Sequence, residues 1–254
     1  MTRQNQLWEY MGQSSPCPPG SRFAATRWSV VLAAGHWRSG TAERQAMDEL
    51  ARAYWFPLYA YLRHKGHLHE SAEDLVQGFF ARLLEKDVLA AVHPSKGRFR
   101  SFLLASLQNY LANEWDRDHA KKRGGDRVVL SFDAMEAKSR YAAEPVTNQT
   151  PERIFERCWA LTVLEQVLQR LRSEYVSRGQ GEIFAALEHV LSAAPKASYA
   201  EVAQRLGMAE GSARVAAHRL RRRYRAILRE EIAQTVSDPA MVDEEIGQLL
   251  ESLR

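Results

Sequence analysis

The stretch SYAEVAQRLGMAEGSARVAAHRL, from Ser198 to Leu220, has the spacing of two helices joined by a tight turn. Ser198 and Glu201 form an S-x-x-E capping box, in which each side chain accepts a hydrogen bond from a backbone amide at the helix start. Gly207 stands where the first helix must end, because glycine adopts left-handed backbone angles without steric cost. The pattern predicts a helix-turn-helix, whose second helix enters the major groove of DNA. An ordinary helical hairpin is the alternative.

The second helix of this pair continues as SARVAAHRLRRRYRAILREE, from Ser212 to Glu231, with seven arginines. At about 100° per residue, Leu220, Tyr224 and the alanines fall on one side and the cationic residues on the other. Solvated helix faces usually mix charges, but no acidic residue occurs between Ser212 and Arg229. Such a face suits nucleic-acid phosphates, which would neutralise it. A surface without a partner, an acidic protein and RNA are the alternatives to DNA.

Two groups of residues on this helix are expected to contact DNA. Those near its start meet base edges, and the later cationic residues meet phosphates. The first group is Glu210, Ser212, Arg214 and Val215, and the second is His218, Arg219, Arg221, Arg222 and Arg225.

Helical periodicity also dominates the first half of the chain, where no alternating strand pattern occurs. Apolar residues at three- and four-residue spacings predict helices over about Thr41–His64, Ser71–Lys86 and Phe99–His119. Pro57 is expected to kink or split the first helix, and Ser71 to cap the second. The stretch AAVHPSKGR before the third helix is expected to be a loop.

The helical pattern stops between the two halves. The intervening segment contains Gly-Gly and Pro without a sustained period, which is typical of a linker. Thr150 and Pro151 then have the residue types preferred at an N-cap and at the first helical position. The predicted fold is all-α, with two small helical domains joined by a flexible linker and the helix-turn-helix in the second. The expected divisions are a loose N-terminal leader (1–22), the first domain (23–122), the linker (123–150), the second domain (151–236) and an acidic C-terminal tail (237–254).

Composition narrows the class of protein. Hydrophobic residues make up 45% of the 254 residues, which argues against global disorder, and the net charge is only +4. Cys17 and Cys158 lack metal-ligand spacing and are expected to be free thiols in a reducing cytoplasm. No apolar run reaches the roughly 20 residues of a membrane span, and the N-terminus lacks a signal-peptide stretch. We therefore expect a cytoplasmic protein without a membrane partner.

Three neighbouring histidines raise the question of a metal site. His64, His67 and His69 lie in the predicted turn HKGHLHE, with Glu70 as the nearest carboxylate and no cysteine beside them, so a solvated turn is the expectation. The chain has no phosphate-binding P-loop, no Gly-x-Ser-x-Gly and no His-Glu-x-x-His. We expect no metal, no cofactor and no enzymatic activity of its own.

Three segments in order carry a family resemblance: ESAEDLVQGFFARLLE (70–85), FRSFLLASLQN (99–109) and HRLRRRY (218–224). Together they resemble an RNA polymerase sigma factor of the extracytoplasmic function (ECF) type. The resemblance covers about Ala46–Lys122 and Phe155–Glu231. It implies a protein that binds core RNA polymerase and directs it to promoters, with the first domain recognising the −10 element and the helix-turn-helix the −35 element.

The resemblance also implies roles for residues of the first domain. In this family the helix matching Ser71–Lys86 binds the largest polymerase subunit, which implies docking by Asp74, Gln77, Arg82 and Glu85. The region matching HPSKGRFRSF opens the promoter and captures one strand of the −10 element, for which cations beside aromatic faces are suited. Core packing is the alternative for both phenylalanines. The implied −10 residues are Lys96, Arg98, Phe99, Arg100, Phe102, Asn109, Asn113, Arg117, Lys121 and Lys122.

The implied partners are core RNA polymerase and promoter DNA. A regulator such as an anti-sigma factor is compatible with the resemblance, although no residue identifies one. The tail is an addition to the family pattern, and it is expected either to pack as a further helix or to fold back on the basic helix and restrain it. The alternative function is a stand-alone helix-turn-helix regulator with an N-terminal sensory or interaction domain. A pure interaction adaptor is a third reading, in which the arginine face has no purpose.

Overall fold

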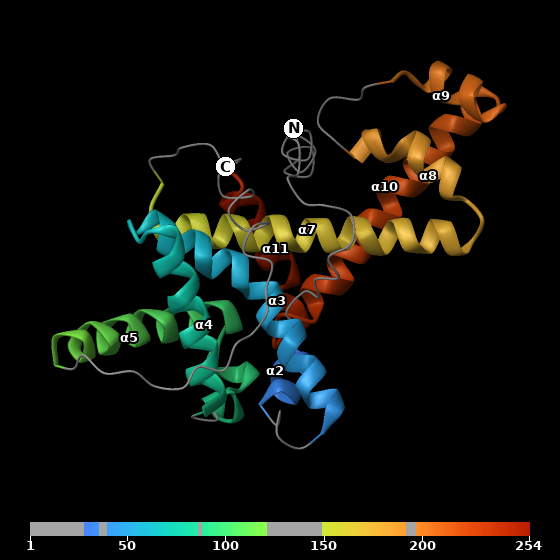
Figure 1. Ribbon diagram of the computed structural model, residues 1–254. Coiled ribbons are helices and arrows are strands. Elements are labelled where there is room, and N and C mark those ends of the chain that lie inside the picture. The colour runs from blue at the N-terminus through green and yellow to red at the C-terminus, as the bar shows by residue number, and fades with distance from the viewer. Residues whose placement is uncertain (1–27, 36–39, 86–87, 121–148, 192–196) are drawn as a thin grey trace.

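The computed structural model describes residues 28–35, 40–85, 88–120, 149–191 and 197–254, and this part of the chain is all-α, as predicted (Figure 1). The leader and nearly all of the predicted linker lie outside the described residues. The helices are α2 (Trp28–Ala34), α3 (Thr41–His64), α4 (His69–Glu85), α5 (Phe99–Ala120), α7 (Pro151–Ser177), α8 (Gly181–Leu187), α9 (Tyr199–Leu206), α10 (Glu210–Ala233) and α11 (Val242–Ser252). None of these described helices is long and apolar enough to cross a membrane.

Helix α3 is central to the first half of the chain. Its bounds, Thr41–His64, are those predicted, and Pro57 lies inside the helix without splitting it. The helix changes direction along its length in Figure 1, as a proline in its interior would cause. Helices α2, α4 and α7 pack around it, so nearly every residue between Leu50 and Leu62 is buried.

Helix α4 begins two residues earlier than predicted. The backbone amide of Ala72 donates to the carbonyl oxygen of Leu68 at 2.8 Å, so Ser71 lies within the first turn and is not the cap. His69 starts the helix, and its Nδ1 lies 2.8 Å from the Tyr59 hydroxyl of α3. The connection to α5, predicted as a loop, contains two short 3₁₀ turns, Val88–Ala91 and Pro94–Lys96.

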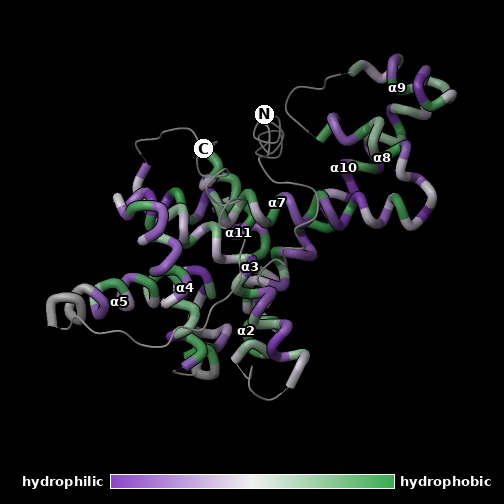
Figure 2. The backbone as a smooth tube through the Cα atoms, in the orientation of Figure 1, coloured by the Kyte–Doolittle hydropathy of each residue, from purple (hydrophilic) through white to green (hydrophobic). Residues whose placement is uncertain are grey.

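Helix α7 joins the two halves of the molecule. Its start is as predicted, because Thr150 Oγ1 accepts a hydrogen bond from the Arg153 amide at 3.3 Å and Pro151 is the first helical residue. It contacts α3, α8, α10 and α11. Its 27 residues extend over about 40 Å at 1.5 Å per residue. Figure 2 shows hydrophobic and hydrophilic positions alternating along it and its neighbours, as amphipathic helices require.

The buried residues of both halves form one hydrophobic cluster. The Tyr54 ring of α3 stacks on Phe155 of α7 with centroids 6.3 Å apart. Nearby, where α2 meets the end of α10, the Trp28 amide donates to Gln234 at 3.0 Å and its indole N–H to Thr235 at 3.1 Å. The division into two separately packed domains is therefore not confirmed: α7 buries residues on more than one face, and each half covers part of it.

The C-terminal tail folds as helix α11 after a short 3₁₀ turn, Pro239–Met241. Val242, Leu249 and Leu253 are buried, and α11 contacts both α7 and α10. It thus packs as a further helix, the first of the two expectations for the tail, and it also reaches the C-terminal end of the basic helix.

Candidate nucleic-acid interface

The turn between α9 and α10 has the local features predicted from its residues. Ser198 Oγ accepts from the Glu201 amide at 3.2 Å, and Glu201 Oε2 accepts from the Ser198 amide at 2.7 Å. These bonds lower the pKa of Glu201. Gly207 ends α9 with φ +62°, in the left-handed region, and the next amide, Met208, donates to Ala203 at 3.0 Å. The chain therefore leaves α9 and enters α10 through a tight, fully bonded turn.

The inner face of α10 is also as predicted. Ala213, Ala217, Leu220, Tyr224 and Ile227 are all fully buried against α7, α8 and α9. This packing fixes the rotation of α10 about its axis, because no other phase would bury all five. The residues on the opposite side are consequently turned toward solvent.

Seven of the nine residues predicted to contact DNA on α10 are exposed. Near the helix start, Arg214 and Glu210 pair at 2.6 Å while both remain on the surface. Between cationic residues, Val215 is 50% exposed. The exposed set is Glu210, Ser212, Arg214, Val215, His218, Arg219 and Arg222, which we call the α10 outer face.

The other two residues of that prediction, Arg221 and Arg225, are half-buried. Arg221 donates from Nε to the Val190 carbonyl and from Nη1 to the Tyr199 hydroxyl, both at 3.2 Å. It therefore links α10 to the turn before α9 and to α9 itself. This corrects the expectation that its guanidinium is presented to phosphates.

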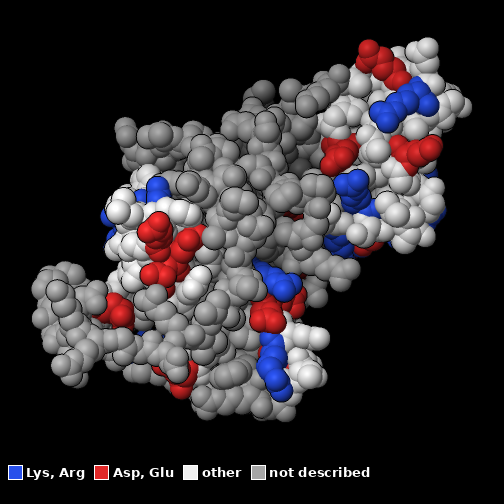
Figure 3. Space-filling view, in the orientation of Figure 1, with Lys and Arg blue, Asp and Glu red and all other residues white. Residues whose placement is uncertain are grey.

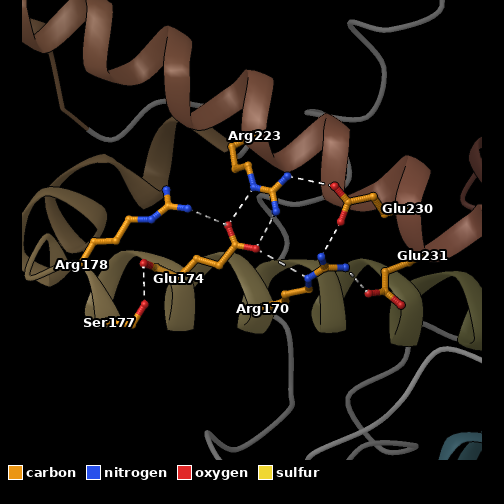
Figure 4. A network of polar contacts seen from close by, with 7 residues as sticks. All are labelled: Arg170, Glu174, Ser177, Arg178, Arg223, Glu230 and Glu231. Atoms are coloured by element: carbon orange, nitrogen blue, oxygen red, sulfur yellow. Dashed lines mark hydrogen bonds and ion pairs between the residues drawn. The ribbon is translucent and has the colours of Figure 1, made fainter.

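Acidic residues of α7 and of the last turns of α10 itself neutralise one flank of this helix (Figure 4). Arg223 donates to both carboxylate oxygens of Glu174 on α7 at 2.7 Å and to Glu230 at 2.9 Å. Arg170 of α7 donates in turn to Glu230 and Glu231. The hydrogen bonds from Arg223 hold the pKa of Glu174 below its ordinary value. The sequence alone indicated an acid-free stretch; in the folded chain, carboxylates from α7 and from the end of α10 pair with Arg223 on this flank.

The surface around this helix end is accordingly mixed in charge. Figure 3 shows basic and acidic side chains close together over the α8–α10 end of the molecule. The α10 outer face is thus a narrow cationic stripe with acidic neighbours, rather than part of a large basic field. A cationic face confined to one helix suits insertion into a single groove of DNA.

Of the two aromatic residues predicted to stack on the −10 strand, Phe99 is buried and Phe102 is half-buried. Phe99 is 3% exposed, with its ring edge-on to Tyr54 and to Trp28 at centroid distances of 5.6 and 6.1 Å. Phe102 is half-buried beside it. The prediction of a stacking face is therefore wrong for Phe99, because the ring fills the space between α2 and α3; the core alternative is correct for it.

Two arginines at the start of α5 join a buried charge cluster with Glu156 of α7 and Glu245 of α11. Arg100 is 4% exposed and donates from Nε to Glu156 at 2.7 Å and from Nη1 to Glu245. Arg98 Nε lies 2.7 Å from the other Glu245 oxygen. We call Arg98, Arg100, Glu156 and Glu245 the α5–α11 charge cluster. Arg100 is thus an interior ion-pair residue, which corrects the prediction that it faces a DNA strand.

The environment of Arg100 keeps it charged although it is buried. Its guanidinium lies 4.0 Å from the ring centroid of Trp159, a cation–π contact. Burial alone would lower the pKa of Arg100, but the carboxylates of Glu156 and Glu245 outweigh it and raise that pKa. Sequence reading missed Glu245, although a signal exists: Val242, Glu245 and Leu249 share an apolar helical stripe, where a carboxylate needs a buried partner.

The remaining predicted −10 residues divide into two groups. Asn109 and Asn113 are exposed on α5, where the Asn113 side-chain amide donates to the Asn109 carbonyl at 2.7 Å. The side chains of Lys96 and Arg117 lie outside the described residues, as do Lys121 and Lys122. The exposed asparagines lie well along α5, away from the charge cluster at its start.

The predicted polymerase-docking residues lie on the outer side of α4. Asp74 and Glu85 are exposed, whereas Gln77 and Arg82 are half-buried. The opposite side of α4, including Val76, Phe79, Phe80 and Leu83, is buried. Leu68, immediately before α4, is 78% exposed, an apolar surface residue that sequence reading did not select.

The three histidines of the turn have separate environments. His69 lies against Tyr59 and is 3.6 Å from Glu73, and His64 Nε2 lies 2.7 Å from the Gln149 carbonyl oxygen. Burial, with Lys65 nearby, lowers the pKa of His67. Within the described residues, no group of three or more side chains is arranged to hold a metal ion.

The chain matches no protein-family model, no curated protein and no solved structure. The assignment of function therefore depends on the sequence motifs and on the geometry described above.

Proposed function

We propose that this protein is a sigma factor similar to the ECF type, which binds core RNA polymerase and directs it to promoters. The observation that carries the proposal is the α9–α10 pair. A capped first helix, a left-handed glycine at its end and an exposed cationic stripe on a firmly packed second helix are the requirements of a helix-turn-helix reader.

In this proposal the first turns of α10 enter the major groove of the −35 element. Arg214 offers the bidentate donor that suits guanine, and Glu210 holds it in position through their ion pair. Val215 offers an apolar contact for a thymine methyl group. His218, Arg219 and Arg222, further along the exposed face, contact phosphates and set the register.

The first half of the chain would supply the contacts with polymerase. The exposed Asp74 and Glu85 on the outer side of α4 support a polar docking surface. Asn109 and Asn113 on α5 remain candidates for the −10 element. Any catalysis belongs to the polymerase in this proposal.

The test is run-off transcription with purified core polymerase, this protein and fragments of genomic DNA. The proposal expects discrete transcripts that need both the protein and the core enzyme. Arg214→Glu with Arg222→Glu should abolish them and leave core binding intact. The matched control is Arg44→Glu with Arg52→Glu, an equal charge change on exposed positions of α3. Absence of protein-dependent transcripts from every fragment would refute the proposal.

One observation favours a second function, a stand-alone helix-turn-helix regulator. The first half shares its core with α7, as a sensory or interaction domain fixed to its DNA-binding unit would. That function predicts tight and specific duplex binding without polymerase, whereas a sigma factor binds a free duplex weakly. A gel-shift series with and without core enzyme separates the two.

A further inference from the structure

Helix α11 touches both helices that the proposed function assigns to promoter DNA. Glu245 pairs with Arg98 and Arg100 at the start of α5. Three residues from it in sequence, Val242 is buried, and the adjacent Asp243 pairs with Arg229 near the end of α10. A single short helix therefore fastens the first half of the chain to the basic helix.

The burial of Arg100 depends on α11. Glu245 is 1% exposed and supplies one of the two carboxylates that offset the desolvation of Arg100; Glu156 of α7 supplies the other. A buried charge that loses one of its partners is strongly destabilised. Without α11 the start of α5 would therefore be left with an under-compensated arginine in the interior, and exposure of that arginine to water becomes the favoured arrangement.

Helix α11 also holds α7 independently of charge. Leu249 and Leu253 are fully buried, and Arg157 of α7 donates to the Leu253 carbonyl at 3.1 Å. On the side facing α5, Glu244 adds a second, more exposed contact to Arg98 at 3.6 Å. The attachment combines an apolar stripe with carboxylates at three successive positions, so it is specific in register.

We infer that α11 is an intramolecular lock on the start of α5, whose carboxylates cover Arg98 and Arg100 until the phosphates of promoter DNA displace them. The inference rests on the proposed function, because it assigns α5 and α10 to the two elements. Phosphates of the promoter strand compete with Glu245 for Arg98, which is the partly exposed member of the charge cluster. Opening then exposes Arg100 as well.

The lock is tested by hydrogen exchange on the full-length chain. Glu245→Gln keeps the shape of the side chain and removes its charge, and exchange of amides at the start of α5 and in α11 should accelerate at least about tenfold. Exchange in α9 and the first half of α10 should not change. The control is Glu251→Lys, an exposed position on α11 outside the pairs named above. Acceleration in α9 as well would indicate general loosening and overturn the inference.

A second variant guards against a folding defect. Asp243→Lys with Glu244→Lys reverses the two surface contacts without placing a new group in the core. With core polymerase present, both variants should bind promoter DNA several-fold more tightly than the wild type, because α11 competes less with the promoter phosphates for Arg98. Unchanged exchange at α5 in both variants overturns the lock, even if the wild type transcribes. Failure of transcription with the wild type and with every variant refutes the proposed function instead. The exchange result then decides by itself whether α11 covers the start of α5.

Discussion

The outer face of α10 and the start of α5 both place arginines beside apolar residues, yet the folded chain treats them differently. Arg214 and Arg222 lie on the surface, whereas Arg100 is 4% exposed between two carboxylates. The difference arises from distant partners, since Glu245 is 145 residues from Arg100 in the sequence. A cationic pattern thus indicates a nucleic-acid surface only when no remote acid reaches it.

The largest difference between the two regions should be in how much an arginine contributes to the free energy of unfolding. Arg100→Ala leaves Glu245 buried without its main partner and should lower the free energy of unfolding by about 3–5 kcal/mol. Arg222→Ala, on the α10 outer face, should change it by less than about 0.5 kcal/mol. Urea unfolding followed by circular dichroism measures both. Similar values for the two variants would remove the distinction between a buried and a displayed arginine.

DNA binding should show the reverse order, with larger effects from the exposed arginines of the α10 outer face than from the buried Arg100. Arg222→Ala should weaken duplex binding uniformly across sequences and lower the slope of log K against log salt by about 1, because one phosphate contact is lost. Arg214→Ala should weaken binding by about tenfold and relax sequence preference at one base pair. Fluorescence anisotropy at several salt concentrations provides both numbers. A general loss of affinity with an unchanged salt slope for Arg222→Ala would place this residue away from the backbone.

A smaller effect tests whether the capping box at Ser198, predicted from neighbouring residues alone, stabilises the helix pair that carries the α10 outer face. Ser198→Ala removes half of the capping box and should cost about 1 kcal/mol of unfolding free energy. Ser173→Ala, exposed on α7, is the matched control and should have almost no effect. Thermal unfolding of the two variants decides the matter, and equal melting temperatures would show that the cap contributes nothing.

The smallest effect concerns the neutralised flank of α10. Hydrogen bonds from Arg223 hold the pKa of Glu174 below its ordinary value of 4.5, so folding favours the charged carboxylate. Its contribution to stability is complete above the unfolded-state pKa and is lost as pH falls through the lower folded-state pKa. Glu174→Gln should therefore flatten the loss of stability below pH 4.5. A pH series of urea midpoints compares it with the wild type; parallel curves would contradict the assignment.

Features set by neighbouring residues could be predicted from the sequence. The bounds of α3, the cap at Thr150, the capping box at Ser198 and the left-handed Gly207 all follow from residues within a few positions. The inner face of α10 followed from helical phase, because burial there repeats with the helix period. These features place and orient the α10 outer face.

Features set by remote residues could not be predicted. Phe99 was placed between core and surface because its spacing fits both, and only the presence of Trp28 and Tyr54 decides for the core. Arg221 has the phase of a surface residue, but the Val190 carbonyl and Tyr199 come within reach when α9 folds over it. The choice between one core and two depends likewise on which helix covers the second face of α7.

The hydrogen bonds of Trp28 with Gln234 and Thr235 also determine how late in synthesis α2 can complete its packing. The two ends of the indole bond are 207 residues apart, so α2 has no complete partner until almost all of the protein has left the ribosome. A nascent chain emerges at about 5–20 residues per second, which leaves Trp28 without these two partners for roughly 10–40 seconds. Synthesis therefore passes through an interval in which this side of α2 is exposed to aggregation and to chaperones, and that interval closes with the residues that end α10.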